Sequence, residues 1–398
     1  MDKVISFIQP SRNNLKYLQW SYNSIRKNLG YRHEICWADD FSDDGTWDWM
    51  NKIFKKDKNV KIMRNDGPTR LGHTILYDKL VDMATNDIVM IYHADMYACP
   101  NMDVEVLKHL ERGKVVSATR IEPPLHPDGP EKVLKDFGIE PEEFDELGLM
   151  SFLHHEREHG EDKLTNGIFA PWAIYKDDFL AIGGHDPLYA PQSKEDSDIF
   201  NRFQLAGYET IQTWQGFVYH MTCRGSRFKD GAMRNPAGQV FMKGRESSEW
   251  LRQNLRSTRN FIRKWGHMVK HDEYLKPIVP PKYDVGFVVK NCDNKMLREL
   301  EPWCSNLYVD DEELILEYIR IEQPDTKFDL RKKLCKPDVE NDVMVTFNPF
   351  KLNQNNIQIL MALPKILQDS GEIGESEIDI FKVFISSLKT YVKELIKC

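Results

Sequence analysis

The sequence predicts an α/β protein, with a mainly parallel sheet and flanking helices in residues 1–275 and a smaller α/β domain in residues 283–398. Two observations carry this prediction. Short apolar runs alternate with amphipathic stretches in both halves of the chain, which is the pattern of βαβ units. Between the halves, residues 276–282 (KPIVPPK) hold three prolines in seven residues, which favours a stiff linker.

Length and composition define the broad class of protein. At 398 residues the chain is long for one core, since domains commonly hold about 100 to 200 residues, and two or three domains are expected. Hydrophobic residues make up 41% and charged residues 29%, as in ordinary soluble globular proteins. The net charge of -8 lacks the basic excess that favours binding to a phosphate backbone, so nucleic acid is not expected as a partner.

Three features bear on where the protein works. The opening MDKVISFIQP lacks the apolar stretch and cleavage site of a secretory signal. No segment approaches the roughly 18 to 20 consecutive apolar residues that cross a bilayer, so no transmembrane segment is expected. The seven cysteines are scattered and lack C-x-x-C spacing, which argues against a disulfide framework. These features predict a cytoplasmic protein whose contact with a membrane, if any, is peripheral.

The first half of the chain opens with strand and helix patterns in alternation. A helical pattern runs through Leu15, Leu18 and Ile25. The apolar, strand-like runs lie at residues 4–8, 34–38, 60–63 and 87–92. Ligands of parallel sheets bind beyond the carboxyl ends of the strands, so the residues that follow each run are expected to carry the chemistry.

Composition suggests the role of the remaining stretches. Residues 122–164 are acidic, punctuated by proline and weakly periodic, which favours an insertion with short helices that we place on the acceptor side of a site. Residues 250–274 form a basic amphipathic pattern and are expected to close the first domain as one helix. After the linker, alternating patterns predict a domain of about 115 residues, large enough to fold alone and free of recognisable chemical motifs.

Carboxylates follow the second apolar run. Asp39 and Asp40 end the predicted strand, and an Asx-rich turn with Ser42, Asp43 and Gly45 leads into the next helix. Carboxylates at such a strand end can accept hydrogen bonds from a nucleobase N–H group or a ribose hydroxyl. A plain acidic turn is the alternative interpretation, because D-G and S-D pairs are common turn formers.

An imidazole and a carboxylate follow the fourth run. His93 and Asp95 are spaced i, i+2 at the strand end, so both side chains can point into one cleft. Asp95 is a hard oxygen ligand, suited to Mn²⁺ or Mg²⁺ that bridges a diphosphate. Taken alone, His93 is more often an ordinary structural histidine.

Two further candidate sites lie later in the first domain. Glu195 and Asp196 precede an amphipathic helix, where carboxylates are oriented by free N–H groups but are also ordinary helix caps. His220 ends the strand-like run IQTWQGFVYH and can ligate a metal or pack as a core histidine. Arg224 and Arg227 follow it, either as basic side chains that close over a diphosphate or as part of a solvated loop.

Taken in order, these sites resemble the motifs of the family 2 glycosyltransferases of the GT-A fold. ADDFSDDGT is similar to the D-D-G-S-x-D-G-T turn of that family, and HAD is similar to its D-x-D motif. FLAIGGHD resembles its G-G-[FH]-D turn, and KED resembles its E-D motif. The resemblance covers about residues 1–275 and implies a GT-A, Rossmann-like catalytic domain there.

The resemblance implies which residues bind the nucleotide-sugar donor. Asp39 would contact the nucleobase, usually uracil, with Asp40 beside it. Arg70, in GPTRLGHT, matches a basic position that is often near the nucleotide. His93 stands where the family usually has the first Asp of D-x-D, a position that commonly serves the ribose or a metal-bound water. A uridine diphosphate sugar is the first expectation for the donor, and a guanosine diphosphate sugar is the second.

The resemblance also implies a mechanism. Asp95 would bind Mn²⁺ or Mg²⁺, with His220 as a further metal ligand. Asp196 would be the general base, with Glu195 as the fallback. The reaction would be a single displacement with inversion at the anomeric carbon, onto a hydroxyl of a glycan, lipid-linked or protein acceptor.

Two alternative functions stay open at this point. His155, Glu156 and His159 match H-E-x-x-H, the zinc peptidase signature, although position 165 is Thr where the extended motif has a third His. A charged, solvated helix face is the plainer interpretation of that segment. The other alternative is a protein that binds a nucleotide-sugar without turnover, which the departure at His93 suggests.

Overall fold

The computed structural model describes residues 3–30, 32–159, 163–222, 231–242, 244, 246–289, 291–335 and 340–397. The chain divides into two compact units, the first with residues up to 253 and 271–277, the second with 254–270 and 278–397. Residues 254–270, assigned above to the first domain, thus cluster with the second unit. The linker at 276–282 remains a prediction.

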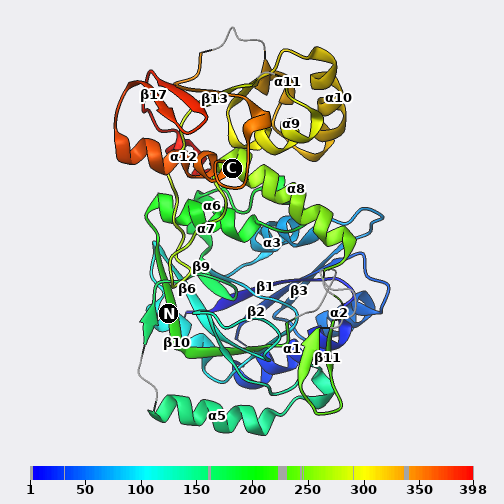
Figure 1. Cartoon of the computed structure of the whole chain (residues 1–398). Coiled ribbons are helices and arrows are strands. Elements are labelled where there is room, and N and C mark those ends of the chain that lie inside the picture. The colour runs from blue at the N-terminus through cyan, green and yellow to red at the C-terminus, as the bar shows by residue number, and fades with distance from the viewer. Residues whose placement is uncertain are drawn as a thin grey trace. The chain divides into compact units, whose positions relative to one another are not determined.

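A ten-stranded sheet forms the centre of the first unit (Figure 1). The strand order is β3-β2-β1-β4-β9-β6-β10-β5, with β7 beside β6 and β8 beside β10. Strands β5, β8 and β9 run antiparallel to their neighbours, and the other pairs are parallel, which confirms the mainly parallel sheet. The strands are β1 (Ile5–Ser11), β2 (Glu34–Asp40), β3 (Val60–Asn65), β4 (Ile88–Ile91), β5 (Met96–Ala98), β6 (Lys114–Glu122), β7 (Lys132–Leu134), β8 (Leu164–Thr165), β9 (Trp172–Tyr175) and β10 (Glu209–His220).

Helices cover both faces of this sheet, which is why its central strands are apolar throughout. Alternate residues serve opposite faces: Phe7 joins one core and Ile8 the other, as do Met90 and Val89. One core is covered by α1 (Leu15–Asn28), α2 (Thr46–Phe54) and α4 (Met102–His109). The other is covered by α3 (Gly72–Met83), α6 (Lys176–Ala181) and α7 (Glu195–Ala206), which lie above the sheet in Figure 1.

The strand directions bring several polar chain segments to one edge. Strands β1, β2, β4, β6 and β10 are mutually parallel, so their carboxyl ends lie at the same side of the sheet. After β4 the chain turns back into β5, which pairs antiparallel with the end of β10 and sets Met96 opposite His220. The Met221 N–H donates to the Asp95 carbonyl at 3.1 Å. This pairing brings the fourth apolar run and the end of β10 together.

The insertion predicted at 122–164 begins where β6 ends and contains β7, the 3-10 helix η1 (Pro141–Glu143) and α5 (Glu146–His159). Strand β7 continues the parallel sheet beside β6, so part of this segment belongs to the sheet. Leu149 and Leu153 of α5 are buried with Phe137 and Tyr219. The remaining short elements of this unit are η2 (Pro187–Tyr189), β11 (Ala232–Arg234) and β12 (Val240–Met242).

The helix expected at 250–274 is shorter than predicted. It is α8 (Ser248–Trp265), and its end at Trp265 rather than Tyr274 corrects the expectation. Gly266 adopts a φ of 76°, and its N–H donates to the Ile262 carbonyl at 2.7 Å. A glycine in the left-handed region ends a helix because it has no Cβ to clash with the chain.

The second unit is the predicted smaller α/β arrangement. Its six-stranded sheet has the order β15-β14-β13-β16-β18-β17, with parallel pairs among β13 to β16 and antiparallel pairs at β18. Phe287, Val345 and Leu360 belong to its buried core. Its elements are β13 (Val285–Val289), α9 (Asn294–Leu300), η3 (Glu301–Trp303), β14 (Asn306–Tyr308), α10 (Glu312–Glu322), η4 (Gln323–Asp325), α11 (Leu330–Lys333), β15 (Leu334–Cys335), β16 (Val343–Phe347), η5 (Pro349–Lys351), α12 (Ile357–Ser370), β17 (Gly374–Ile378), β18 (Phe381–Ile385) and η6 (Val392–Leu395).

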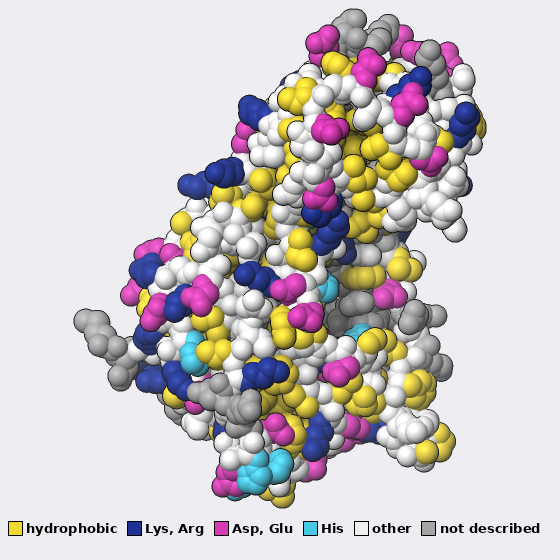
Figure 2. All heavy atoms as spheres, turned by 60° about the vertical axis from the view of Figure 1, so that its left-hand side comes forward, with side chains coloured by type: hydrophobic (Ala, Val, Ile, Leu, Met, Phe, Trp, Pro, Cys, Tyr) yellow, Lys and Arg dark blue, Asp and Glu magenta, His cyan; other side chains and the backbone are white. Residues whose placement is uncertain are grey.

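Two features of the molecule concern its surroundings. Among the described residues, no helix combines the length and apolar character needed to cross a membrane. On the face drawn in Figure 2, the side chains of Lys and Arg are interspersed with those of Asp and Glu. Mixed surface charge of this kind is typical of ordinary globular proteins.

Candidate functional site

A cavity of about 840 Å³ lies at the carboxyl edge of the first sheet. Its walls come from the segments after β1, β4 and β10 and from the first turns of α3 and α7. This is where open α/β sheets bind their ligands. The predicted site residues that line it are Asp40, Arg70, His93, Asp95, Glu195, Asp196 and His220.

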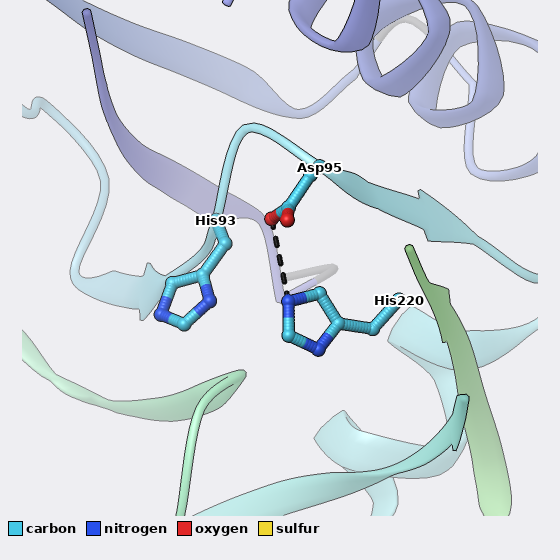
Figure 3. Close-up of side chains that lie close together, drawn as sticks. All are labelled: His93, Asp95 and His220. Atoms are coloured by element: carbon cyan, nitrogen blue, oxygen red, sulfur yellow. Dashed lines mark ion pairs between the residues drawn. The ribbon is translucent and has the colours of Figure 1, made fainter. Parts of the chain in front are cut away.

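Two imidazoles and one carboxylate meet in this cavity, as Figure 3 shows. One ligand atom from each of His93, Asp95 and His220 lies within 4.8 Å of the others. His220 Nε2 is 3.3 Å from Asp95 Oδ1, and the two imidazole rings are 5.5 Å apart between centroids. Within the described part of the chain, no other such cluster of three or more His, Cys, Asp or Glu side chains is present. The expected metal ligands Asp95 and His220 are together, and His93, expected at the nucleotide, joins them.

The protonation of the two imidazoles differs. Burial, followed by the neighbouring His220, lowers the pKa of His93 to about 3, so His93 is neutral and keeps a free lone pair. Burial alone would lower the pKa of His220, but Asp95 and Glu122 outweigh it and raise that pKa to about 9. A metal ion at His220 Nε2 would therefore replace a proton.

Glu122, which the sequence analysis did not single out, holds His220 from behind. The His220 Nδ1–H donates to Glu122 Oε1 at 2.8 Å, which leaves Nε2 directed at Asp95. Lys132 and Arg120 lie 3.2 and 3.3 Å from the Glu122 carboxylate. Burial raises the pKa of Glu122, but Arg120, His220 and Lys132 outweigh it and hold the pKa far below its usual value. The signal in the sequence is a carboxylate at the end of another strand, ATRIE.

The consecutive carboxylates Asp39 and Asp40 face different surroundings. Asp40 lines the cavity and accepts hydrogen bonds from the N–H groups of Leu71 (3.0 Å) and Gly72 (2.8 Å), so it anchors the start of α3. Asp39 is fully buried outside the cavity lining, with Arg64 Nε 3.3 Å from its Oδ2. Burial raises the pKa of Asp39 despite Ser42 and Arg64. The contact predicted between Asp39 and a nucleobase stays a prediction.

Arg70 lines the cavity beside Asp40. Its Nε is 3.6 Å from Asp40 Oδ2, and its Nη2 donates to Gln192 Oε1 at 3.2 Å. Burial and the guanidinium of Arg12, which also lines the cavity, lower the pKa of Arg70. The other two predicted cations, Arg224 and Arg227, lie outside the described residues.

Two consecutive carboxylates at the first turn of α7 differ in protonation. Glu195 is buried, and its Oε1 is 2.6 Å from Nε2 of His73, a residue that the sequence analysis did not identify. Burial raises the pKa of Glu195, but His73 outweighs it and the net shift is downward. Burial, followed by Glu195, raises the pKa of Asp196 to about 6. Asp196 is therefore the carboxylate suited to accept a proton near neutral pH.

The H-E-x-x-H segment lies on α5 and is open to solvent. His155 and His159 are exposed, with ring centroids 4.6 Å apart. Figure 2 shows histidine side chains open at its lower end, where Figure 1 places α5. Among the described residues these two histidines have no third side chain that completes a metal-ligating group. This arrangement favours the solvated helix face over a peptidase site.

Known proteins resemble the first part of the chain. Residues 6–175 match the family model described as Glycosyl transferase family 2, a segment that includes His93 and Asp95. Three solved structures each align with 55% of this chain. GalNAc-T7 with UDP, GalNAc and Mn²⁺ is 13% identical, with a TM-score of 0.41 over 43% of that protein. The mannosyltransferase PcManGT from Pyrobaculum calidifontis, in complex with GDP-Man and Mn²⁺, is 15% identical, with a TM-score of 0.39 over 56%. TarS 1-349 from S. aureus is 13% identical, with a TM-score of 0.38 over 60%.

The chain thus covers about half of the length of these proteins. The family match covers β1 to β9 of the large sheet, including the turn after β2 and the segment that carries Asp95. That sheet is mainly parallel and has helices on both faces, as described above. Residues 6–175 of the first unit are therefore similar to the family 2 glycosyltransferases, and they include the predicted positions Asp39, Asp40, Arg70, His93 and Asp95.

Proposed function

We propose that the chain is a metal-dependent glycosyltransferase, which moves a sugar from a nucleoside diphosphate donor to an acceptor hydroxyl with inversion at the anomeric carbon. One observation carries this proposal: His93, Asp95 and His220 share a cavity with Asp196, a carboxylate with its pKa raised to about 6. A cation site and a base in one cavity are what this chemistry requires.

The three clustered side chains fit a divalent cation. His93 is neutral, His220 presents Nε2, and Asp95 supplies an oxygen, so the donor set is two nitrogens and one carboxylate. Mg²⁺ prefers oxygen ligands, whereas transition ions also accept imidazole, so this set favours Mn²⁺ over Mg²⁺. When bound, the ion would offset the negative charge that develops on the departing diphosphate.

The residues of this chain would carry the proton. Asp196 accepts the proton of the acceptor hydroxyl while the hydroxyl oxygen forms its bond to the anomeric carbon. The bond from that carbon to the diphosphate oxygen breaks, and its electron pair leaves with the nucleoside diphosphate. Attack from the side opposite to the leaving group inverts the configuration. Glu195 is less suited to this role, because its carboxylate is already paired with His73.

Other residues in the cavity suggest where the substrates lie. Arg12, Arg70 and the Asp40-anchored loop would border the nucleotide, with a uridine diphosphate sugar as the first donor to test and a guanosine diphosphate sugar as the second. Glu140, from the 122–164 segment, also lines the cavity and accepts a hydrogen bond from the Tyr17 hydroxyl at 2.7 Å. This position supports an acceptor-side role for that segment, for a glycan, lipid-linked or protein hydroxyl.

The test is thermal stabilisation and donor hydrolysis across a panel of nucleotide-sugars, with and without Mn²⁺. Wild type, Asp95→Ala and the exposed control Asp82→Ala are compared. We expect one donor to stabilise wild type and Asp82→Ala only when Mn²⁺ is present, and we expect Asp95→Ala to lose that effect. Stabilisation without hydrolysis or transfer to any acceptor would favour the binding protein without turnover. If none of the nucleotide-sugars binds, the proposal is overturned.

A further inference from the structure

The pair of the half-buried His73 and the buried Glu195 arises from a close approach between two segments of the first unit. Gly72 begins α3 with a φ of 76°, and a Cβ built on it would lie 2.1 Å from the Pro191 carbonyl oxygen. The Thr74 N–H donates a long hydrogen bond to the same Pro191 carbonyl oxygen, with an N···O distance of 3.5 Å. The first turn of α3 is thus held against the chain just before α7, which places His73 beside Glu195.

The contact between the two side chains is short, with Glu195 buried and 31% of the His73 side chain exposed. His73 Nε2 lies 2.6 Å from Glu195 Oε1, and Glu195 is 5% exposed. The other oxygen, Glu195 Oε2, is buried and has no hydrogen-bond partner among the described residues. His73 is therefore the side chain that compensates this carboxylate, because a buried carboxylate is stable only when it is paired.

Asp196 is surrounded by groups from several elements. Glu195 precedes it on α7, and His73 and Tyr77 face it from α3. His185, before η2, and Arg120, on β6, also act on it, and Asp95 lies across the cavity. The His185 Nδ1 is 2.7 Å from Asp78 Oδ1, so that ring is already committed to another carboxylate. His73 and His185 both act on Glu195 and Asp196 through their charge, and His73 is the one that contacts Glu195 directly.

We propose that His73 is a positioning residue that assigns the base role to Asp196, by holding the adjacent, buried Glu195 ionised in an ion pair. This inference rests on the transferase function proposed above. Two neighbouring buried carboxylates share one proton unless a cation stabilises one of them. The positive charge of His73 keeps Glu195 ionised, so Glu195 does not compete with Asp196 for a proton. Asp196 is then free to take the proton of the acceptor hydroxyl.

The first test is the pH dependence of kcat/KM in wild type, His73→Gln, His73→Lys and the exposed control His155→Gln. Removing the positive charge raises the pKa of the carboxylate pair, so the active, deprotonated base appears only at higher pH. We expect His73→Gln to move the acidic limb of the profile upward by about one pH unit, within the range for a lost charge partner. His73→Lys keeps the charge and should return the limb toward wild type, and His155→Gln should leave it unchanged. A His73→Gln profile that superimposes on wild type would overturn the proposal.

A second measurement is independent of transfer activity. The ring of His73 is followed by NMR as a function of pH, in wild type and in Glu195→Gln. Burial lowers the pKa of His73, but Glu195 outweighs it, so we expect a midpoint above the usual value of about 6.5 in wild type. Glu195→Gln should lower that midpoint. A wild-type midpoint at or below the usual value would refute the proposed ion pair. This result needs only the wild-type protein, so it holds even where a His73 variant fails to fold. An inactive wild type with a raised midpoint would instead refute the transferase function while leaving the pair intact.

Discussion

Glu122 provides a test of how the proposed cation site is built. Its carboxylate accepts the Nδ1–H of His220 at 2.8 Å and is kept ionised by Arg120 and Lys132. In Glu122→Gln the amide keeps the shape and a neutral hydrogen bond. A hydrogen bond to a charged group contributes about 1.5 to 3 kcal/mol and a neutral one about 1 kcal/mol. The expected loss is therefore about 0.5 to 2 kcal/mol, or roughly a 2- to 30-fold weaker affinity for Mn²⁺.

The affinity is measured by titrating Mn²⁺ and following the free ion by its electron paramagnetic resonance signal. Glu131→Gln is the matched control, because Glu131 is 3.1 Å from Arg120 and 3.5 Å from Lys132 but makes no contact with His220 among the hydrogen bonds of the described residues. We expect this control to bind Mn²⁺ as wild type does. If Glu122→Gln stays folded and its affinity is within twofold of wild type, the assignment of Glu122 as the group that orients His220 is refuted.

Three further predictions follow from the same unit. In the proposed mechanism the active form of Asp196 is the carboxylate. Burial and Glu195 raise its pKa to about 6, so kcat/KM should fall about tenfold from pH 7 to pH 5, and Asp196→Asn should abolish transfer while Mn²⁺ binding persists. Asp198→Ala should lower the free energy of unfolding in urea by about 3 to 5 kcal/mol, because it removes the carboxylate that lies 2.8 Å from the fully buried Arg202 guanidinium. Asp177→Ala, which removes an exposed ion pair with Arg112, should cost less than about 1 kcal/mol. Gly72→Ala should lower the unfolding temperature more than Gly113→Ala, since both have a φ near 76° but a Cβ at Gly113 meets no atom within 4 Å. Equal losses in the last pair would contradict the close approach at Pro191.

The large sheet and one part of the site were predictable from local patterns. Apolar runs separated by amphipathic helices predict parallel strands, and parallel strands place the residues after them at one edge. Asp95 and His220 follow such strands, and the structure brings them together. The same rule is too coarse for Asp39 and Asp40, since successive strand residues point to opposite faces and only Asp40 lines the cavity.

The residues that orient the site residues could not be predicted from local sequence patterns. Glu122 and His220 are 98 positions apart, and His73 and Glu195 are 122 positions apart. Their contacts depend on which strands become neighbours and on how closely α3 approaches the chain before α7. The close approach needs Gly72, whose role appears only when Pro191 is seen against it. The end of α8 at Trp265 was not predicted for a different reason. The amphipathic pattern was extended past Gly266, whose backbone conformation ends the helix.

The mixed donor set of His93, Asp95 and His220 bears on which ion the proposed cation site would hold. Sites with two imidazoles follow the Irving–Williams order, in which Zn²⁺ and Cu²⁺ bind more tightly than Mn²⁺. The site itself therefore does not select the weaker-binding ion. The occupant is decided by which ion is abundant and exchangeable when the chain folds, so a cell that starves of manganese or accumulates zinc would change the fraction of competent protein without altering its amount. Samples purified over nickel or with trace zinc carry the same risk of a wrong occupant.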